Sequence, residues 1–320
     1  SIMGNEEYKA KYRPLLPNCN TIIYNDEKSL NNITKQTAAV VIEPIQGATG
    51  FVTPENDFLQ KVRERCNETG TLLIFDEIQT CFGRLGILFA FEKYNVTPDI
   101  LCIAKGMGGG MPIGAFIASW ELMNLLTFEP KLGHITTFGG HPINCAASLA
   151  TLEVLLSTNV MSKIKEKEQL FRQHLQHQKI KEIRGKGLML AAITTSAEVT
   201  NHVVLEAQKQ GLILFWLLFE PKAIRITPPL TISKEEITLA NPRDPNLLST
   251  LKIEASHDLD DILSNPRSTN GEIGITKKDL DSLRDYLKPD CQLAVLPETD
   301  DVEFKLVEDQ LKLKSRGINK

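Results

Sequence analysis

The sequence has little of what marks a membrane, secreted or nucleic-acid-binding protein. No apolar run approaches the length of a membrane span, and the first residues hold no apolar signal core. The six cysteines form no CxxC pair, a usage typical of reduced cytosolic thiols rather than of a disulfide framework. A formal net charge of -4 gives no support for a nucleic-acid or anionic-membrane partner. We therefore expect a cytoplasmic protein with neither kind of partner.

The chain does contain enough apolar residues for a sizeable core. Its 320 residues are 42% hydrophobic, and this length suggests roughly two domains. Short β-rich runs alternate with amphipathic segments, as in an α/β sheet, and continuous apolar runs are typical of strands covered on both faces. One helix is expected to end at Gly70, with an apolar face of Phe58, Leu59, Val62 and Cys66. The expected strands are 21–24, 38–44, 72–75, 100–104 and 113–119.

Residues 239–320 differ in composition from the rest. They hold 16 acidic and 12 basic side chains, so they carry all of the net charge. They open with the turn-formers NPRDPN, and Thr276 is expected to cap a helix in KKDLDSLRDYL. Strands are expected in CQLAVLP and DVEFKLV. We interpret this tail as a small appended unit or a poorly packed extension of unknown role.

Two apolar runs end in side chains of opposite charge. TLLIFDEIQT leads into Asp76 and Glu77, whereas DILCIAKGMGGGMPIGA leads into Lys105 and a run of glycines. In open α/β sheets, ligands bind beyond the carboxyl ends of the strands, so Asp76 and Lys105 are expected at the ligand-binding edge. There an acid and an amine would hold opposite sides of one small flat molecule.

Three mechanisms use such residues. An apolar run followed by DE describes the magnesium-binding strand of a P-loop ATPase, but GxxxxGK[ST] does not occur, and only a segment before residue 1 would supply it. The run GMGGGMPIG fails the dinucleotide pattern GxGxxG in every register. The third is a pyridoxal phosphate enzyme, in which a lysine binds the cofactor aldehyde covalently and an aspartate holds the ring nitrogen protonated.

Residues 1–237 resemble the class III aminotransferases, the group of the acetylornithine, ornithine and 4-aminobutyrate enzymes. Six motifs carry the resemblance, in the same order: VVIEPIQG, LLIFDEIQTCFGR, PDILCIAKGMGGGMPIGA, HITTFGGHP, IRGKGLML and IRITPPLTI. It implies the fold type I of pyridoxal phosphate enzymes, which is like aspartate aminotransferase. A large α/β domain with a mixed, mostly parallel sheet would span 1–148, incomplete at its N-terminus. A smaller α+β domain would span 149–238, before the tail 239–320.

The resemblance also implies roles for four residues near the two strand ends. Lys105 would bind the cofactor and then, once freed, move a proton between substrate and cofactor carbons. Asp76 would keep the ring nitrogen protonated, since an ion pair at about 4 Å is worth about 4 kcal/mol at an effective dielectric constant of 20. Ile78 would pack on the ring and Gln79 would contact its phenolic oxygen. By sequence alone, Gln79 also fits a loop amide that satisfies backbone groups.

Two more residues gain roles, and others depart from the family. Thr137 would reach the cofactor phosphate of a neighbouring subunit, which implies a homodimer, although a turn-capping threonine is the alternative. Arg225, which faces away from its apolar strand neighbours, would bind a substrate carboxylate, although a solvated charge is the alternative. Ala48 replaces a family glutamate that pairs with this arginine. Cys81 replaces a glycine and Leu85 a threonine.

We therefore expect an aminotransferase that moves an amino group from an amino acid or ω-amine donor to 2-oxoglutarate. A PLP aminomutase or racemase would keep the same acid and lysine. A catalytically impaired fragment or interaction protein derived from an aminotransferase is the remaining alternative, because the family's phosphate-binding loop would lie before residue 1 and the tail is foreign to the family. For the same reason we expect these residues alone to bind the cofactor weakly.

Overall fold

The computed structural model describes residues 1–131 and 134–239. All of them fall in one compact unit, Ser1–Ser256. The expected helix after Thr276 and the expected strands CQLAVLP and DVEFKLV lie outside the described residues, as does nearly all of the proposed tail. The division into segments 1–148, 149–238 and 239–320 stays a prediction.

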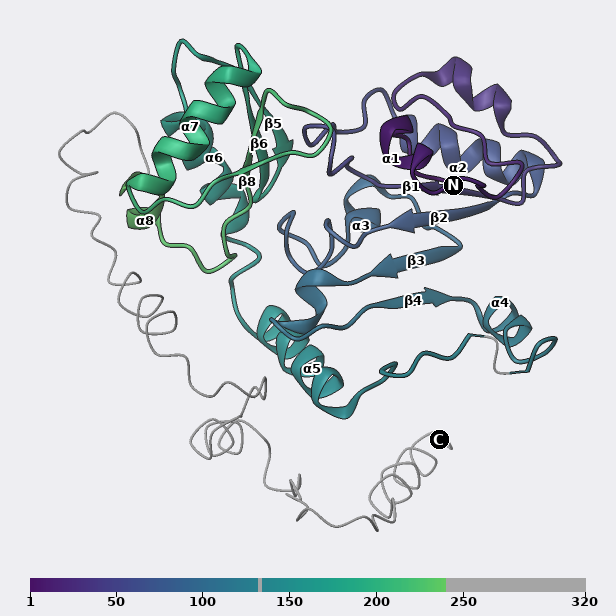
Figure 1. Cartoon of the computed structure of the whole chain (residues 1–320). Helices are drawn as coiled ribbons and strands as arrows, with labels where there is room; N and C mark the ends of the chain where they lie inside the picture. Colours follow the sequence, from purple (N-terminus) through teal and green to yellow (C-terminus); the bar gives the residue numbers. More distant parts are fainter. Residues whose placement is uncertain (132–133, 240–320) are drawn as a thin grey trace, which may run out of the picture. The chain divides into compact units, whose positions relative to one another are not determined.

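The first sheet has four strands in the order β1-β2-β3-β4 (Figure 1). The strands β1, β2 and β3 run parallel, and β4 pairs with β3 antiparallel. The mixed, mostly parallel sheet expected from the sequence is therefore confirmed. The four strands are β1 (Ala39–Ile42), β2 (Leu72–Asp76), β3 (Ile100–Ile103) and β4 (Ala115–Ala118).

The prediction of a strand at 21–24 is wrong. This segment is an irregular chain and a turn. Its backbone is held locally, because the Ser29 hydroxyl accepts from the Ile23 N–H at 3.0 Å and donates to the Ile23 carbonyl at 3.1 Å. Tyr24 packs on Phe58 with ring centroids 5.2 Å apart. The Ser29 side chain thus satisfies the two backbone groups of Ile23 that a neighbouring strand would have paired.

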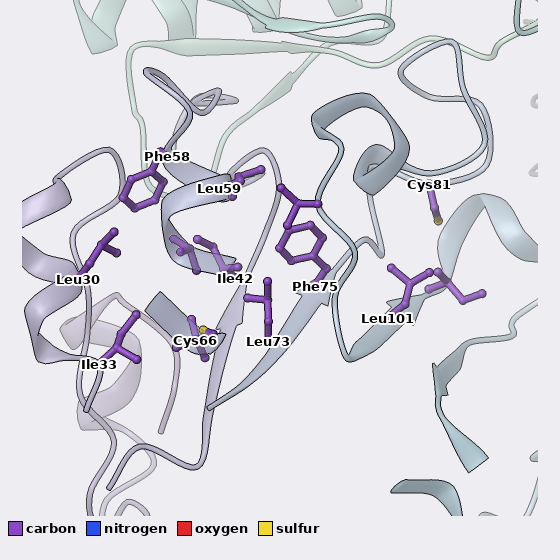
Figure 2. Close-up of a cluster of buried hydrophobic side chains, with 14 of the residues drawn as sticks. Leu30, Ile33, Ile42, Phe58, Leu59, Cys66, Leu73, Phe75, Cys81 and Leu101 are labelled. Atoms are coloured by element: carbon purple, nitrogen blue, oxygen red, sulfur yellow. The ribbon is translucent and has the colours of Figure 1, made fainter. Parts of the chain in front are cut away.

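Helix α2 (Phe58–Thr69) builds the core beneath the first sheet (Figure 2). Its buried residues are Phe58, Leu59, Val62 and Cys66, the apolar face that the sequence predicts. The helix ends at Gly70, whose φ of +73° suits glycine because it has no Cβ. The helical face packs with Leu73 and Phe75 of β2. Each such side chain contributes about 1.5–3 kcal/mol when it is fully buried, so this contact fixes the position of β2.

The second sheet is antiparallel throughout, in the order β5-β6-β8-β7. Every residue of β6 is buried. Its two faces pack in different clusters: Met189, Ala191 and Ile193 meet Ile45 and Phe51, and the alternate residues meet helices α6 and α7. Its elements are α6 (Ile164–His174), β5 (Ile180–Lys186), β6 (Met189–Thr194), α7 (Ala197–Lys209), β7 (Phe215–Trp216), β8 (Ala223–Ile226) and α8 (Lys234–Leu239). The remaining elements are α1 (Glu6–Ala10), η1 (Glu27–Asn32), α3 (Ala90–Tyr94), η2 (Lys105–Gly108), α4 (Trp120–Leu125) and α5 (Pro142–Ser157).

The expectation that the first sheet is covered on both faces is wrong for the described residues. Leu72 and Ile74, which alternate with the buried residues of β2, are only half-buried. The neighbours Phe116 and Ile117 of β4 are 46% and 51% exposed, so this strand is open on both faces. The sixteen residues of α5 are largely apolar, yet only Leu155 is buried. Covering groups for β4 and α5 are not found within 1–131 and 134–239.

Across these same ranges, no helix is both long enough and apolar enough to cross a bilayer.

Candidate active site

The carboxyl ends of β1, β2 and β3 bring three ionisable side chains to one edge of the sheet. Asp76 is the last residue of β2 and pairs with Cys102 of β3. Lys105 follows β3 and begins η2. Ile42 of β1 pairs with Phe75, so Glu43 comes next to Asp76 in the same register. The parallel pairing therefore gathers two carboxyl groups and one amine.

Asp76 and Glu77 point to opposite faces, as neighbours along a strand do. Asp76 is half-buried at the site, and one of its oxygens accepts from the Ile78 N–H at 3.0 Å. Glu77 is fully buried and accepts from the N–H groups of Ala90 (2.5 Å) and Phe91 (2.8 Å). It thereby satisfies the first amides of α3, whose positive end favours a carboxylate. Asp76 is the group left for a ligand.

Lys105 sits on an unusual backbone. Its φ is +47°, a conformation that costs a residue with a Cβ and that persists only where the surroundings impose it. Helix α5 helps to fix this turn: a Cβ on Gly109 would overlap the Thr151 hydroxyl, and the Asn144 amide donates to the Pro112 carbonyl at 2.7 Å. The glycine run thus allows α5 to approach η2 closely. The run therefore has a packing role against α5.

The surroundings of Lys105 favour its neutral amine. Desolvation, followed by the nearby Arg225 guanidinium, lowers the pKa of Lys105 below its ordinary value, and Asp76 and Glu43 oppose this shift. A neutral amine is the form that attacks an aldehyde and that accepts a proton. Cys81 lies beneath this turn. Burial raises the pKa of its thiol to about 12, and its Sγ contacts the Ala104 carbonyl at 3.7 Å.

Gln79 reaches the same edge of the sheet from the turn that follows β2. It is half-buried, and so is Ile78. A Cβ on Gly47 would come 2.5 Å from Gln79 Oε1 and 3.0 Å from Glu43 Oε2. Because Gly47 has no side chain, the Gln79 amide and the Glu43 carboxyl group can both approach its backbone closely.

Arg225 comes from the second sheet. It lies between two buried isoleucines of β8 and faces away from them, as the sequence predicts. Its Nε donates to the Thr227 hydroxyl at 3.0 Å, and no acid in the described chain forms an ion pair with it. Arg84 lies near it but is engaged, since its guanidinium donates to the carbonyls of Leu188 (3.1 Å) and Pro228 (2.6 Å). Arg225 is thus the cation with capacity for an incoming anion.

Thr137 is exposed in the turn before α5, and its side chain makes no hydrogen bond to a described residue. Its predicted role is not tested by these contacts. Two neighbours of the site were missed by sequence reasoning. Glu43 had a usable signal, because AVVIE ends an apolar run in an acid as LLIFD does. Arg84 had none, because the carbonyls of Leu188 and Pro228 that it binds lie more than a hundred residues along the chain.

The donor set fits pyridoxal phosphate. Asp76 supplies a half-buried acid with one oxygen not engaged by the Ile78 amide. Lys105 supplies an amine with a lowered pKa at the end of the next strand, within electrostatic reach of that acid. Ile78 and Gln79 lie half-buried between them along the chain, and one apolar and one amide side chain suit an aromatic ring with a phenolic oxygen.

Comparisons with known proteins agree with this chemistry. The family described as aminotransferase class-III matches residues 2–241. The ornithine aminotransferase structure from Toxoplasma gondii is 32% identical, with a TM-score of 0.67, over 73% of this chain and 57% of that one. The N-acetylornithine aminotransferase from Stenotrophomonas maltophilia is 29% identical, with a TM-score of 0.62, over 77% and 64%. A PLP-bound amine transaminase from an uncultivated Pseudomonas species is 28% identical, with a TM-score of 0.67, over 78% and 63%. The chain thus spans less than two thirds of the length of these proteins.

Proposed function

Because the chain belongs to the class III aminotransferase family, we propose that it is a pyridoxal-phosphate-dependent aminotransferase. Its donor would be an amino acid or an ω-amine of the ornithine, acetylornithine or 4-aminobutyrate type, and its acceptor 2-oxoglutarate. One observation carries the proposal. An acid and an amine end adjacent parallel strands, and the pKa of the amine is lowered.

Pyridoxal phosphate, when bound, supplies an electron sink that makes the substrate α-hydrogen acidic. The chain's own residues would do the rest. Asp76 keeps the ring nitrogen protonated, Ile78 covers a ring face, and Gln79 donates to the phenolic oxygen. Lys105 would hold the cofactor covalently and, when its amine is free, would carry the proton from the substrate carbon to the cofactor carbon. The lowered pKa of Lys105 helps both tasks, since each needs the neutral amine.

Arg225 would bind the substrate carboxylate. A guanidinium without an acid partner, beside the lysine, offers a planar fork that matches a carboxylate bidentately. At position 48 the family resemblance implies a glutamate, but this chain has Ala48. No carboxylate at this position therefore competes for the Arg225 guanidinium. We therefore expect Arg225 to accept a carboxylate in both half-reactions, with little preference between ω-amines and α-amino acids.

We also propose a homodimer, a cytoplasmic location and the two-domain division. The open apolar residues of β4 and α5 support a dimer, in which Thr137 would reach the partner's cofactor phosphate. The five cysteines of the described chain are all free, as a reducing compartment requires. The first sheet lies within 1–148 and the second within 149–238, which supports a large and a small domain.

Covalent labelling tests the proposal. Reduction of the cofactor-treated 320-residue chain with borohydride should fix the label on Lys105, located by peptide mass spectrometry. Lys105→Ala should lose both the label and amino transfer, while Lys93→Ala, which removes an exposed lysine of α3, should keep both. A label on another lysine would remove the assignment. A labelled protein that isomerises its substrate without amino transfer would instead be an aminomutase or racemase.

A further inference from the structure

Glu43 is a half-buried carboxyl group just after β1, at the edge of the sheet where Asp76 lies. The proposed mechanism assigns it no role. The register of β1 on β2 places it beside Asp76, and residues at matching positions of parallel strands point to the same face. Two acids therefore stand side by side at the cofactor end of the sheet. The groups that face Glu43 are Asp76 from β2, Lys105 from η2, the Tyr24 phenol from the segment before η1 and the Gly47 amide from its own loop.

Gly47 links Glu43 to Gln79. The Gly47 N–H donates to Glu43 Oε2 at 2.7 Å, which fixes the carboxyl group. Glu43 Oε2 and Gln79 Oε1 both lie close to the point where a Cβ on Gly47 would stand, at 3.0 Å and 2.5 Å from it. The amide oxygen and the carboxyl group thus approach the same point of the Gly47 backbone. The amide nitrogen of Gln79 is consequently turned away from Gly47.

Glu43 suits this position because its surroundings favour the protonated form. Burial, with the like charge of Asp76, raises the pKa of Glu43, while the Gly47 amide and Lys105 oppose the shift. A protonated carboxyl group can donate to an amide oxygen, whereas a carboxylate would repel it. No ion pair of Glu43 occurs in the described chain.

We propose that Glu43 is a positioning residue that, with Gly47, holds the Gln79 amide with its nitrogen toward the phenolic oxygen of the cofactor. The coupling of the two side chains is inferred from their common approach to Gly47 in this chain. Its consequence for the cofactor rests on the proposed function. Two experiments on the full 320-residue chain separate these claims.

The first experiment needs no cofactor. Unfolding midpoints are measured for Glu43→Ala, Gln79→Ala and the double variant. Coupled side chains give non-additive effects, so the shift caused by Gln79→Ala should shrink when Glu43 is already alanine. Equal shifts in both backgrounds would overturn the proposal, whether or not the chain takes up pyridoxal phosphate.

The second experiment measures pyridoxal phosphate affinity and the pH titration of the bound cofactor's visible absorbance. Gln79→Ala should weaken binding about tenfold or more, the loss of one hydrogen bond to a charged oxygen. Glu43→Ala and Gly47→Ala should weaken binding in the same direction and displace the titration as Gln79→Ala does. Glu43→Gln, which retains an uncharged donor, should restore the wild-type titration.

In the Gln79→Ala background, Glu43→Ala should have no further effect on either readout. Glu64→Ala, which removes an exposed acid of α2, is the matched control and should change neither. An unchanged titration in Glu43→Ala, or failure of Glu43→Gln to restore it, would overturn the positioning role. A wild-type chain that gives no borohydride label on Lys105 even at saturating pyridoxal phosphate would overturn the cofactor proposal instead, and the unfolding cycle would still decide the coupling.

Discussion

At the residue scale, the end of β2 shows how one alternation separates two adjacent acids. Asp76 faces the ligand-binding edge, and Glu77 faces the core, where it holds the first amides of α3. The sequence predicts that Asp76 lies at an edge of the sheet, because it directly follows an apolar run that is typical of a buried strand. It does not predict the partner of Glu77, because α3 begins thirteen residues later and its N-terminus becomes visible only in the folded chain.

Arg225 gives the prediction at this scale. Ala48→Glu should add an anion for this unpaired guanidinium and shift the ratio of kcat/KM for α-amino and ω-amine donors by about tenfold, the equivalent of about 1.4 kcal/mol. The donor class whose carboxylate binds Arg225 should lose kcat/KM relative to the other class. Ala48→Gln, similar in size but uncharged, is the control for steric effects. Identical donor ratios in wild type and Ala48→Glu would contradict the assignment of Arg225 as a free carboxylate site.

At the scale of elements, Glu77 fastens α3 to β2, and its removal should cost stability. Glu77→Ala leaves the buried N–H groups of Ala90 and Phe91 without an acceptor, at about 1–3 kcal/mol for each unsatisfied group. Glu92→Ala, which removes the exposed capping partner of Phe89 on the same helix, should cost about 1 kcal/mol or less. Urea unfolding of the two variants measures both losses.

The pH dependence of the Glu77 effect has a definite sign. Burial raises the pKa of Glu77 above 4.5, and its hydrogen bonds oppose the shift only in part. The folded state then binds more protons than the unfolded state, so the stability that Glu77 provides is fully present below pH 4.5 and falls as pH rises through the raised value. The loss caused by Glu77→Ala should therefore shrink as pH rises over that window. A loss that grows with pH would refute this account.

Elements were predictable where periodicity was long and unpredictable where it was short. Helix α2 was found with its buried face and its terminal Gly70, because twelve residues carry several repeats of the pattern. The run 21–24 was too short to distinguish a strand from a loop, and Ser29 decided the outcome by taking its backbone bonds. Glu43 shows a different failure: the signal was the same as for Asp76, but only the strand register makes it meaningful.

At the scale of the whole molecule, sequence patterns say nothing of what meets across long separations. Arg84 is held by the carbonyls of Leu188 and Pro228, more than a hundred residues away, and this joins the turn after β2 to the second sheet. Burial on both faces, expected for the strands of the first sheet, is found in the second sheet instead, along β6 and at the adjacent Ala223 and Ile224 of β8. In the first sheet and its neighbouring helix, apolar residues such as Phe116 of β4 and Leu149 of α5 stay exposed in the described chain.

The open face of α5 leads to the last prediction. Leu149 and Leu156 are 58% and 63% exposed and lie seven residues apart, so they share one stripe of the helix. An apolar helix in water is unstable unless something covers it, and in a dimer each buried leucine contributes about 1.5–3 kcal/mol. The full chain should therefore sediment as a dimer at micromolar concentration. Leu149→Glu with Leu156→Glu should forfeit about 6 kcal/mol or more over both protomers and yield monomers. Glu64→Ala, which removes an exposed acid of α2 away from this stripe, should leave the dimer intact. A wild-type chain that stays monomeric at tens of micromolar would show that this stripe is not a dimer interface.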